Sequence, residues 1–229
     1  MKVPDIGQGL KNVLFQHGAS LVGFGDLSNL VSDGQTYGVS VAIAVPAAVI
    51  RSIEYGPTPE YYHEYYRIND LLDDAVTAGA EYLRQNGCEA KAMTCGSVVE
   101  SDDHRTALPY KTVATRAGIG WIGKCALLVT KEYGSAVRLS ALVTNAPLAC
   151  AKPIDESFCG SCTACAAACP GKAVSGKLWN KDMDREEFFH AADCRKAARM
   201  LAKEKLNKEI TLCGKCVFVC PYTQKYIAE

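Results

Sequence analysis

The grouping of the cysteines is the feature that most constrains how this chain can fold. Of its 12 cysteines, eight fall in the last third of the 229 residues. Seven of these form two runs, C-x2-C-x2-C-x3-C-P starting at Cys159 and C-x2-C-x3-C-P starting at Cys213. The eighth, Cys194, lies between the runs. So many thiols at fixed spacing indicate inorganic cofactors around which this part of the chain must fold.

The first run has the spacing of bacterial [4Fe–4S] ligation, in which three cysteines hold one cluster and the cysteine before the proline holds the other. The second run supplies the matching half, and Cys194 takes the place of its missing first ligand. We therefore predict two clusters with crossed ligation. The first is held by Cys159, Cys162, Cys165 and Cys220, and the second by Cys169, Cys194, Cys213 and Cys216.

Two structural zinc sites or a disulfide scaffold are the alternatives for these cysteines. Zinc accepts C-x2-C pairs but has no use for a third cysteine followed by C-P. Disulfides are not expected, because the N-terminal residues lack the pattern of a secretory signal. The remaining cysteines have no motif spacing, and most cysteines of this kind are small buried apolar residues. These are Cys88, Cys95, Cys125 and Cys150.

Helix and strand patterns alternate in the first two thirds of the chain. Helices are expected at Ile6–His17, from Thr58 to Gly87, at Pro109–Ala117 and, further on, at Arg185–Leu206. Strands are expected at Ser20–Phe24, Gly38–Val45, Glu89–Thr94, Cys125–Thr130 and Ser135–Thr144, the last two forming a hairpin. We predict an α/β (α+β) fold, with a layered mixed-sheet domain at residues 1–150 and a ferredoxin-like double [4Fe–4S] module at residues 151–229.

The charge pattern excludes a protein that binds nucleic acid mainly through a basic surface. The formal net charge is zero, with 12 basic and 15 acidic residues in 1–150 and 13 basic and 10 acidic residues in 151–229. The longest apolar run, Val39–Ile50, is too short for a membrane span and is broken by Pro46. We expect a cytoplasmic protein that does not bind membranes.

A glycine-rich phrase follows the third predicted helix. Gly118–Gly123 satisfies G-x-G-x-x-G, but it follows a helix and enters a strand, the reverse of a dinucleotide fingerprint. No acidic residue stands about twenty positions further on, as a ribose-binding site would need. The phrase therefore does not indicate a Rossmann nucleotide site.

The longer segment from Leu108 to Thr130, the Tyr-Gly-Ser turn that starts at Tyr133 and the cysteine motif together resemble the epoxyqueuosine reductase family. These are iron–sulfur enzymes that use cobalamin and share their core with reductive dehalogenases. The likeness implies a cobalamin-binding first domain. The residues that it places at the cobalamin site are Gly118, Gly120, Trp121, Ile122, Gly123 and Lys124.

The residue types of the phrase permit this role. Glycines let the backbone approach a bulky ligand closely, Trp121 offers a flat face, and Lys124 can reach an amide or phosphate. The alternative is that Trp121 is a core residue and the glycines only form turns.

Two departures from the family pattern bear on the reaction. Members that act on tRNA carry an Asp-Ser-Ala-Pro segment whose aspartate is implied to donate a proton, and an ungapped count from Trp121 puts that position on His104. His104, the adjacent Asp103 and Tyr110 are the candidate donors, since dehalogenase relatives use a tyrosine; the alternative for residues 102–105 is a solvated loop. The chain also ends at Glu229, without the helical-repeat extension of the tRNA-modifying members. The resemblance thus implies a short form, for which we expect no tRNA partner.

These observations predict an iron–sulfur oxidoreductase that passes electrons through two [4Fe–4S] clusters to bound cobalamin, for reductive chemistry on a small substrate. An external low-potential donor of the ferredoxin or flavodoxin type would supply the electrons. The basic residues of the last predicted helix are a docking surface for such a donor or only a solvated face: Arg195, Lys196, Arg199, Lys203 and Lys205. A non-catalytic electron-transfer protein and a corrinoid-reducing or corrinoid-handling protein are the alternative functions.

Overall fold

The computed structural model describes residues 5–31 and 34–228, which gather into two compact units. The first unit takes in the chain up to Ala44, then Arg67–Ile119 and Arg138–Ile154. The second unit takes in Val45–Tyr66, Gly120–Val137 and the chain from Asp155 onward. The predicted boundary near residue 150 lies close to the start of this last segment. The second unit also contains one segment from the first half of the chain and one from its middle.

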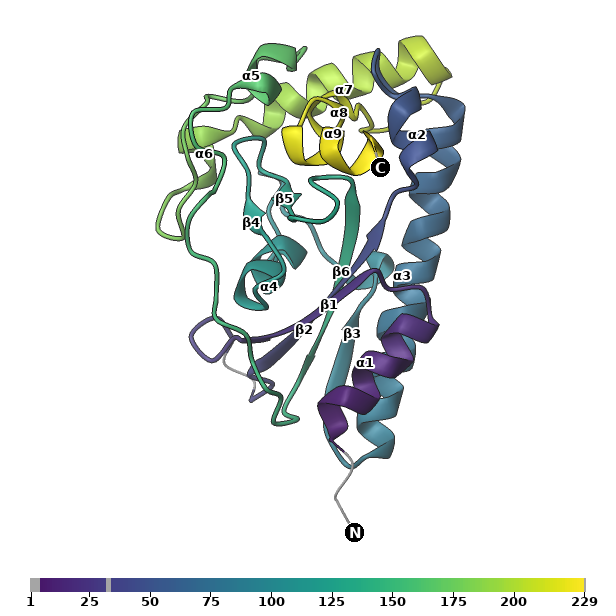
Figure 1. Cartoon of the computed structure of the whole chain (residues 1–229), viewed down its shortest axis with the longest axis vertical. Helices are drawn as coiled ribbons and strands as arrows, with labels where there is room; N and C mark the ends of the chain where they lie inside the picture. Colours follow the sequence, from purple (N-terminus) through teal and green to yellow (C-terminus); the bar gives the residue numbers. More distant parts are fainter. Residues whose placement is uncertain (1–4, 32–33, 229) are drawn as a thin grey trace. The chain divides into compact units, whose positions relative to one another are not determined.

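A four-stranded sheet in the order β1-β2-β6-β3 forms the centre of the first unit (Figure 1). Its strands correspond to four of the predicted strands, and the pairs β1–β2 and β3–β6 are antiparallel. The bounds are β1 at Leu21–Asp26, β2 at Tyr37–Ala44, β3 at Ala90–Met93 and β6 at Val137–Thr144.

Helices cover both faces of this sheet (Figure 1). On one face, α1 (Ile6–Gln16) and α3 (Pro59–Gln85) meet β6, where Gly79 leaves room for Leu14 and Leu142. On the other face lies α4 (Tyr110–Arg116), whose Val113 packs in a buried cluster. That cluster comprises Leu27, Val113, Ala141 and Val143. Successive residues of β6 thus face opposite sides, as a strand requires. The layered α/β (α+β) fold is confirmed.

The second unit consists of short elements around a two-stranded hairpin. Strands β4 (Trp121–Ile122) and β5 (Leu128–Val129) pair antiparallel, and Ile122 packs against Trp179 and Phe188. The helices are α2 at Ala47–Ser52, α5 at Ala164–Ala168, α6 at Arg185–Phe188, α7 at Ala191–Leu206, α8 at Lys215–Phe218 and α9 at Pro221–Ala228.

Two predicted elements differ from the observed ones. The expected hairpin of residues 125–130 with 135–144 does not form, because β5 pairs with β4 while β6 joins the larger sheet. The expected helix Arg185–Leu206 is broken after Phe188. Phe189 is extended and forms a bridge with Val174, and His190 N–H donates to the Ala173 carbonyl. These tertiary hydrogen bonds outweigh the local helix propensity.

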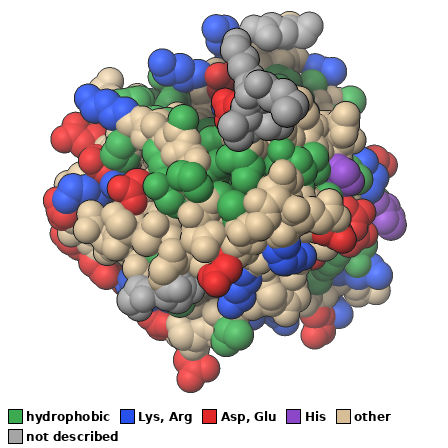
Figure 2. Space-filling view, turned by 90° about the horizontal axis from the view of Figure 1, so that it is seen from below, with side chains coloured by type: hydrophobic (Ala, Val, Ile, Leu, Met, Phe, Trp, Pro, Cys, Tyr) green, Lys and Arg blue, Asp and Glu red, His purple; other side chains and the backbone are tan. Residues whose placement is uncertain are grey.

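The surface agrees with the balanced composition. In the face shown in Figure 2, basic and acidic side chains are interspersed around an apolar area. Within the described ranges, no helix is long and apolar enough to cross a membrane.

Gly134 in the Tyr-Gly-Ser turn offers a test of the packing of the second unit. Its φ is +58°, and a Cβ there would collide with the backbone nitrogen of Thr223 in α9. Gly176 has a φ of +89°, but a Cβ there would meet no atom within 4 Å, so it is a matched control. We expect Gly176→Ala to cost about 1–2 kcal/mol for the left-handed backbone alone. Gly134→Ala should cost clearly more in the free energy of unfolding, measured by denaturant titration; equal costs would contradict this packing.

Candidate functional site

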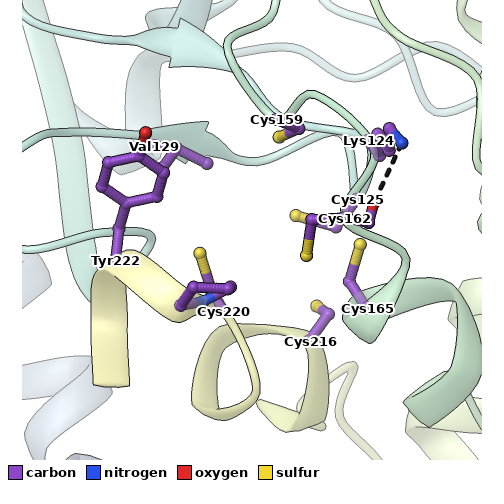
Figure 3. Close-up of a pocket in the computed structure, with 10 residues that line it drawn as sticks. Lys124, Cys125, Val129, Cys159, Cys162, Cys165, Cys216, Cys220 and Tyr222 are labelled. Atoms are coloured by element: carbon purple, nitrogen blue, oxygen red, sulfur yellow. Dashed lines mark hydrogen bonds between the residues drawn. The ribbon is translucent and has the colours of Figure 1, made fainter. Parts of the chain in front are cut away.

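A cavity in the second unit is lined by six cysteines (Figure 3). Its volume, which includes the space at its open side, is about 420 Å³. Three of the sulfurs come from the loop before α5 and from its first turn, and two from α8 and the residue before α9. The lining cysteines are Cys125, Cys159, Cys162, Cys165, Cys216 and Cys220. All four residues predicted to hold the first cluster are therefore on this wall.

A second cavity in the same unit, of about 470 Å³, is lined by five cysteines. Cys194 reaches it from α7 together with Ala197 and Ala198, and the N–H of Ala173 donates to Cys169 Sγ over 3.3 Å. The lining cysteines are Cys125, Cys169, Cys194, Cys213 and Cys216. All four residues predicted to hold the second cluster are on this wall. Cys125 and Cys216 line both cavities, so the two cavities adjoin.

The thiols surround these cavities instead of converging on a point. Among the described residues, no three His, Cys, Asp or Glu side chains come together as a site for one metal ion. Zinc needs four ligands about 2.3 Å from a single ion, whereas a cubane is held by thiolates spread around a larger body. The donor set and its spread around the two cavities fit [4Fe–4S] clusters.

The environment of the thiols opposes their ionisation when no cation is present. Burial, followed by the charges of Cys169 and Cys213, raises the pKa of Cys194 to about 11. Burial is also the largest cause of the raised pKa of Cys213. Thiolates are the metal-binding form, so binding of iron has to displace these protons.

The glycine-rich phrase leads into the wall of the first cavity, which begins at Lys124 and Cys125. A Cβ at Gly120 would collide with the Val129 carbonyl, and one at Gly123 would come within 2.8 Å of the Val129 side chain and 3.6 Å of Cys159 Sγ. Trp121 is 1% exposed, and its ring lies 5.2 Å from that of Phe158 and 5.0 Å from that of Tyr222. These glycines thus let the hairpin pack closely beside the cysteines.

The other residues of the phrase lie in different surroundings. Ile122 belongs to the buried core of the second unit. Gly118 belongs to the first unit, with a φ of +67° and the Lys152 carbonyl 3.0 Å from where a Cβ would stand. The structure therefore divides the six residues that the resemblance assigns to cobalamin between the two units.

Lys124 is a buried cation on the wall of the first cavity. Its side chain is 4% exposed, and Nζ donates to the Cys162 carbonyl over 2.9 Å, as the dashed line in Figure 3 shows. It thereby braces the loop that carries three of the cysteines. Sequence reasoning placed Lys124 beside cobalamin and did not anticipate this contact.

The three candidate proton donors lie in the first unit. His104 and Asp103 share one turn, where His104 Nδ1 is 2.7 Å from Glu100 and Asp103 pairs with Arg105 at 2.9 Å. A hydrogen bond from Ser101 lowers the pKa of the exposed Asp103 carboxyl. Tyr110 instead starts α4, is half-buried, and donates to the Met93 carbonyl over 2.7 Å. Burial raises its pKa to about 12.

Sequence comparison agrees with this geometry. Residues 158–223 match the family model described as the 4Fe-4S double cluster binding domain. The epoxyqueuosine reductase of Lactococcus garvieae is 39% identical over 118 residues, which are 52% of this chain and 33% of that protein. The epoxyqueuosine reductase of Synechocystis sp. is 33% identical over 177 residues, which are 72% of this chain and 61% of that protein. The chain thus spans between a third and three fifths of these relatives.

Solved structures show the same fold. A catabolic reductive dehalogenase, NpRdhA, in complex with 3-bromo-4-hydroxybenzoic acid, aligns with a TM-score of 0.68 at 18% identity, over 96% of this chain and 32% of that one. The epoxyqueuosine reductase of Streptococcus thermophilus aligns with a TM-score of 0.62 at 24% identity, over 96% and 66%. Fold and cysteine pattern define a protein with a double [4Fe–4S] cluster domain. The resemblance to the epoxyqueuosine reductase-like family is confirmed.

Lys124 provides a test of the first cavity. Lys124→Met removes a buried positive charge and its hydrogen bond beside anionic ligands, whereas Lys131→Met removes an exposed one in the turn after β5. Hydrogen bonds that involve charged groups contribute about 1.5–3 kcal/mol. We expect Lys124→Met to lose iron to a chelator about tenfold faster, which corresponds to about 1.4 kcal/mol. Equal rates for the two variants would show that Lys124 does not support the cluster.

Proposed function

We propose that this chain is an iron–sulfur oxidoreductase that passes electrons through two [4Fe–4S] clusters to a bound cobalamin, for reductive chemistry on a small substrate. The observation that carries the proposal is the pair of adjoining cavities, each with four predicted cysteine ligands on its wall. The similarity to proteins named epoxyqueuosine reductase supports a reductase over other iron–sulfur proteins.

The ligation that we propose is crossed between the two runs. Cys220, from the second run, completes the first cluster with Cys159, Cys162 and Cys165, because it lines the first cavity and not the second. The second cluster takes Cys169, Cys194, Cys213 and Cys216. Such clusters reach potentials low enough for demanding reductions.

Cobalamin is the proposed site of the reaction, and its strongly reducing cobalt would supply the chemistry. One relative of the same fold, at a TM-score of 0.68, is a reductive dehalogenase whose structure suggests a mechanism for B12-dependent dehalogenation. In this chain, the indole N–H of Trp121 is buried without a hydrogen-bond partner among the described residues. Buried donors are rarely left unpaired, so this one fits an acceptor on a bound cofactor. We assign Gly120 and Trp121 to that site and Lys124 to the first cluster.

Tyr110 is the proton donor that we favour. Its phenol is half-buried and, with a pKa raised to about 12, keeps its proton across the physiological range. His104 Nδ1 already lies beside Glu100, and the Asp103 carboxylate is already paired with Arg105. They are the second choice.

An external low-potential carrier of the ferredoxin or flavodoxin type is the proposed electron source. Helix α7 lines the second cavity with Cys194, Ala197 and Ala198, and it carries Arg195 and Lys196 close by in sequence. An acidic carrier that docks on these residues would stand near the second cluster. The free thiols and the proposed clusters support a cytoplasmic location, because thiols stay reduced there.

A non-catalytic electron-transfer protein is the second candidate. One observation favours it. Ile122 packs in the core and Lys124 donates to the Cys162 carbonyl, so these two residues, which the resemblance places at the cobalamin site, have other contacts. A measurement of cobalamin binding distinguishes this function from the proposed cobalamin-dependent reductase.

The crossed ligation predicts which cysteine variants share an effect. Cys159→Ala and Cys220→Ala, from opposite runs, should alter the same component of the EPR spectrum of the reduced protein. Cys169→Ala and Cys213→Ala should alter the other component. Iron analysis should show about half of the wild-type content in each variant, because one four-ligand site is lost. If Cys220→Ala instead groups with Cys213→Ala, the ligation is not crossed.

The proposed function predicts that anaerobically purified protein binds added cobalamin. Corrinoid absorption bands should co-elute with the iron–sulfur bands in size-exclusion chromatography, and Trp121→Phe, which lacks the N–H, should weaken this binding. Iron–sulfur bands alone would overturn the function and leave the electron-transfer alternative.

The same purified protein can be assayed for turnover of the tRNA substrate. We expect little turnover of an epoxyqueuosine-containing tRNA stem-loop, because His104 stands where the resemblance implies an aspartate. His104→Asp restores that carboxylate and is the matched variant. Turnover by the wild type would identify the tRNA as the substrate.

A further inference from the structure

Cys125 is a ninth thiol in the second unit and belongs to neither predicted ligand set. It lies in the turn of the β4–β5 hairpin and is 5% exposed. The turn is tight, since Gly123 N–H donates to the Leu127 carbonyl and Ala126 N–H to the Gly123 carbonyl. The sulfur is therefore held in a fixed place and does not belong to a mobile loop.

The place of this sulfur is between the two cavities. Cys125 lines both of them, and the only other cysteine of the described chain that does so is Cys216. It shares the wall of the first cavity with Cys165, assigned to the first cluster, and it shares both walls with Cys216, assigned to the second. In Figure 3 it stands beside the ring of cysteines around the first cavity. If Cys125 only filled space in the core, any apolar side chain of its size would serve. Its position on the walls of both cavities instead suggests a role for the sulfur.

We propose that Cys125 is a positioning residue that donates its single S–H to the ligand sulfur of Cys216 and so raises the reduction potential of the second cluster. Each cavity already has four predicted ligands, which leaves Cys125 free to act as a donor. Hydrogen bonds to cluster sulfurs favour the reduced, more negative form, and a buried site with low dielectric strengthens them. This inference rests on the cluster assignment of the proposed function.

The test is a redox titration of the cluster-loaded protein, followed by EPR, without added cobalamin. Cys125→Ala removes the donor, Cys125→Ser replaces it by a hydroxyl, and Cys88→Ala removes a cysteine that lines neither cavity. We expect Cys125→Ala to keep the wild-type iron content while the midpoint potential of the second cluster shifts to a more negative value. Cys125→Ser should have a potential at or above that of the wild type, because a hydroxyl is a stronger donor than a thiol, and Cys88→Ala should show no shift.

Every other outcome of this titration also either supports or overturns the proposal. Unchanged potentials in Cys125→Ala would overturn the proposal, and so would loss of iron from both Cys125 variants, because that identifies a ligand. If Cys125→Ala alone takes up no clusters, Cys125→Ser decides: potentials at or above the wild type support the donor role, and lower ones refute it. A wild type that forms no clusters would overturn the proposed function itself, whereas failure to bind cobalamin leaves this test intact.

Discussion

The eight cysteines that we propose as ligands of two cubanes come from separate segments of the second unit. Three lie before α5 or in its first turn, Cys169 lies at the end of α5, Cys194 lies in α7, and the others lie just before α8, in α8 and just before α9. Apart from α7, these helices are short and bury few apolar residues. We therefore expect the cohesion of the unit to depend on metal ligation, as it does in many small metal-binding domains.

The β4–β5 hairpin completes the enclosure from a distant part of the sequence. Gly120 and Gly123 allow it to approach Val129 and Cys159, and Gly134 allows the following turn to approach Thr223. Lys124 and Cys125 then project into the walls, one as a buried cation and one as a thiol. The glycine-rich phrase is explained in part by this close packing, independently of any ligand.

Sequence reasoning predicted the elements that local pattern determines. The four strands of the larger sheet and the long helix α3 follow from periodicity, and the walls of the two cavities contain the two ligand sets that spacing predicts. It did not predict the break at Phe189, which arises from backbone hydrogen bonds to residues 173–175. The pairing of β5 with β4 and the place of Cys125 were also missed, because both depend on contacts between segments that no local pattern encodes.

The central claim is that two cubanes occupy the two cavities with crossed ligation. Anomalous diffraction at the iron absorption edge, from crystals grown without oxygen, tests it most directly. We predict two separate iron peaks, one bonded to Cys220 together with the first three cysteines of the first run, and one bonded to Cys169. A single peak, peaks at the zinc edge, or an iron bonded to Cys125 would contradict the account.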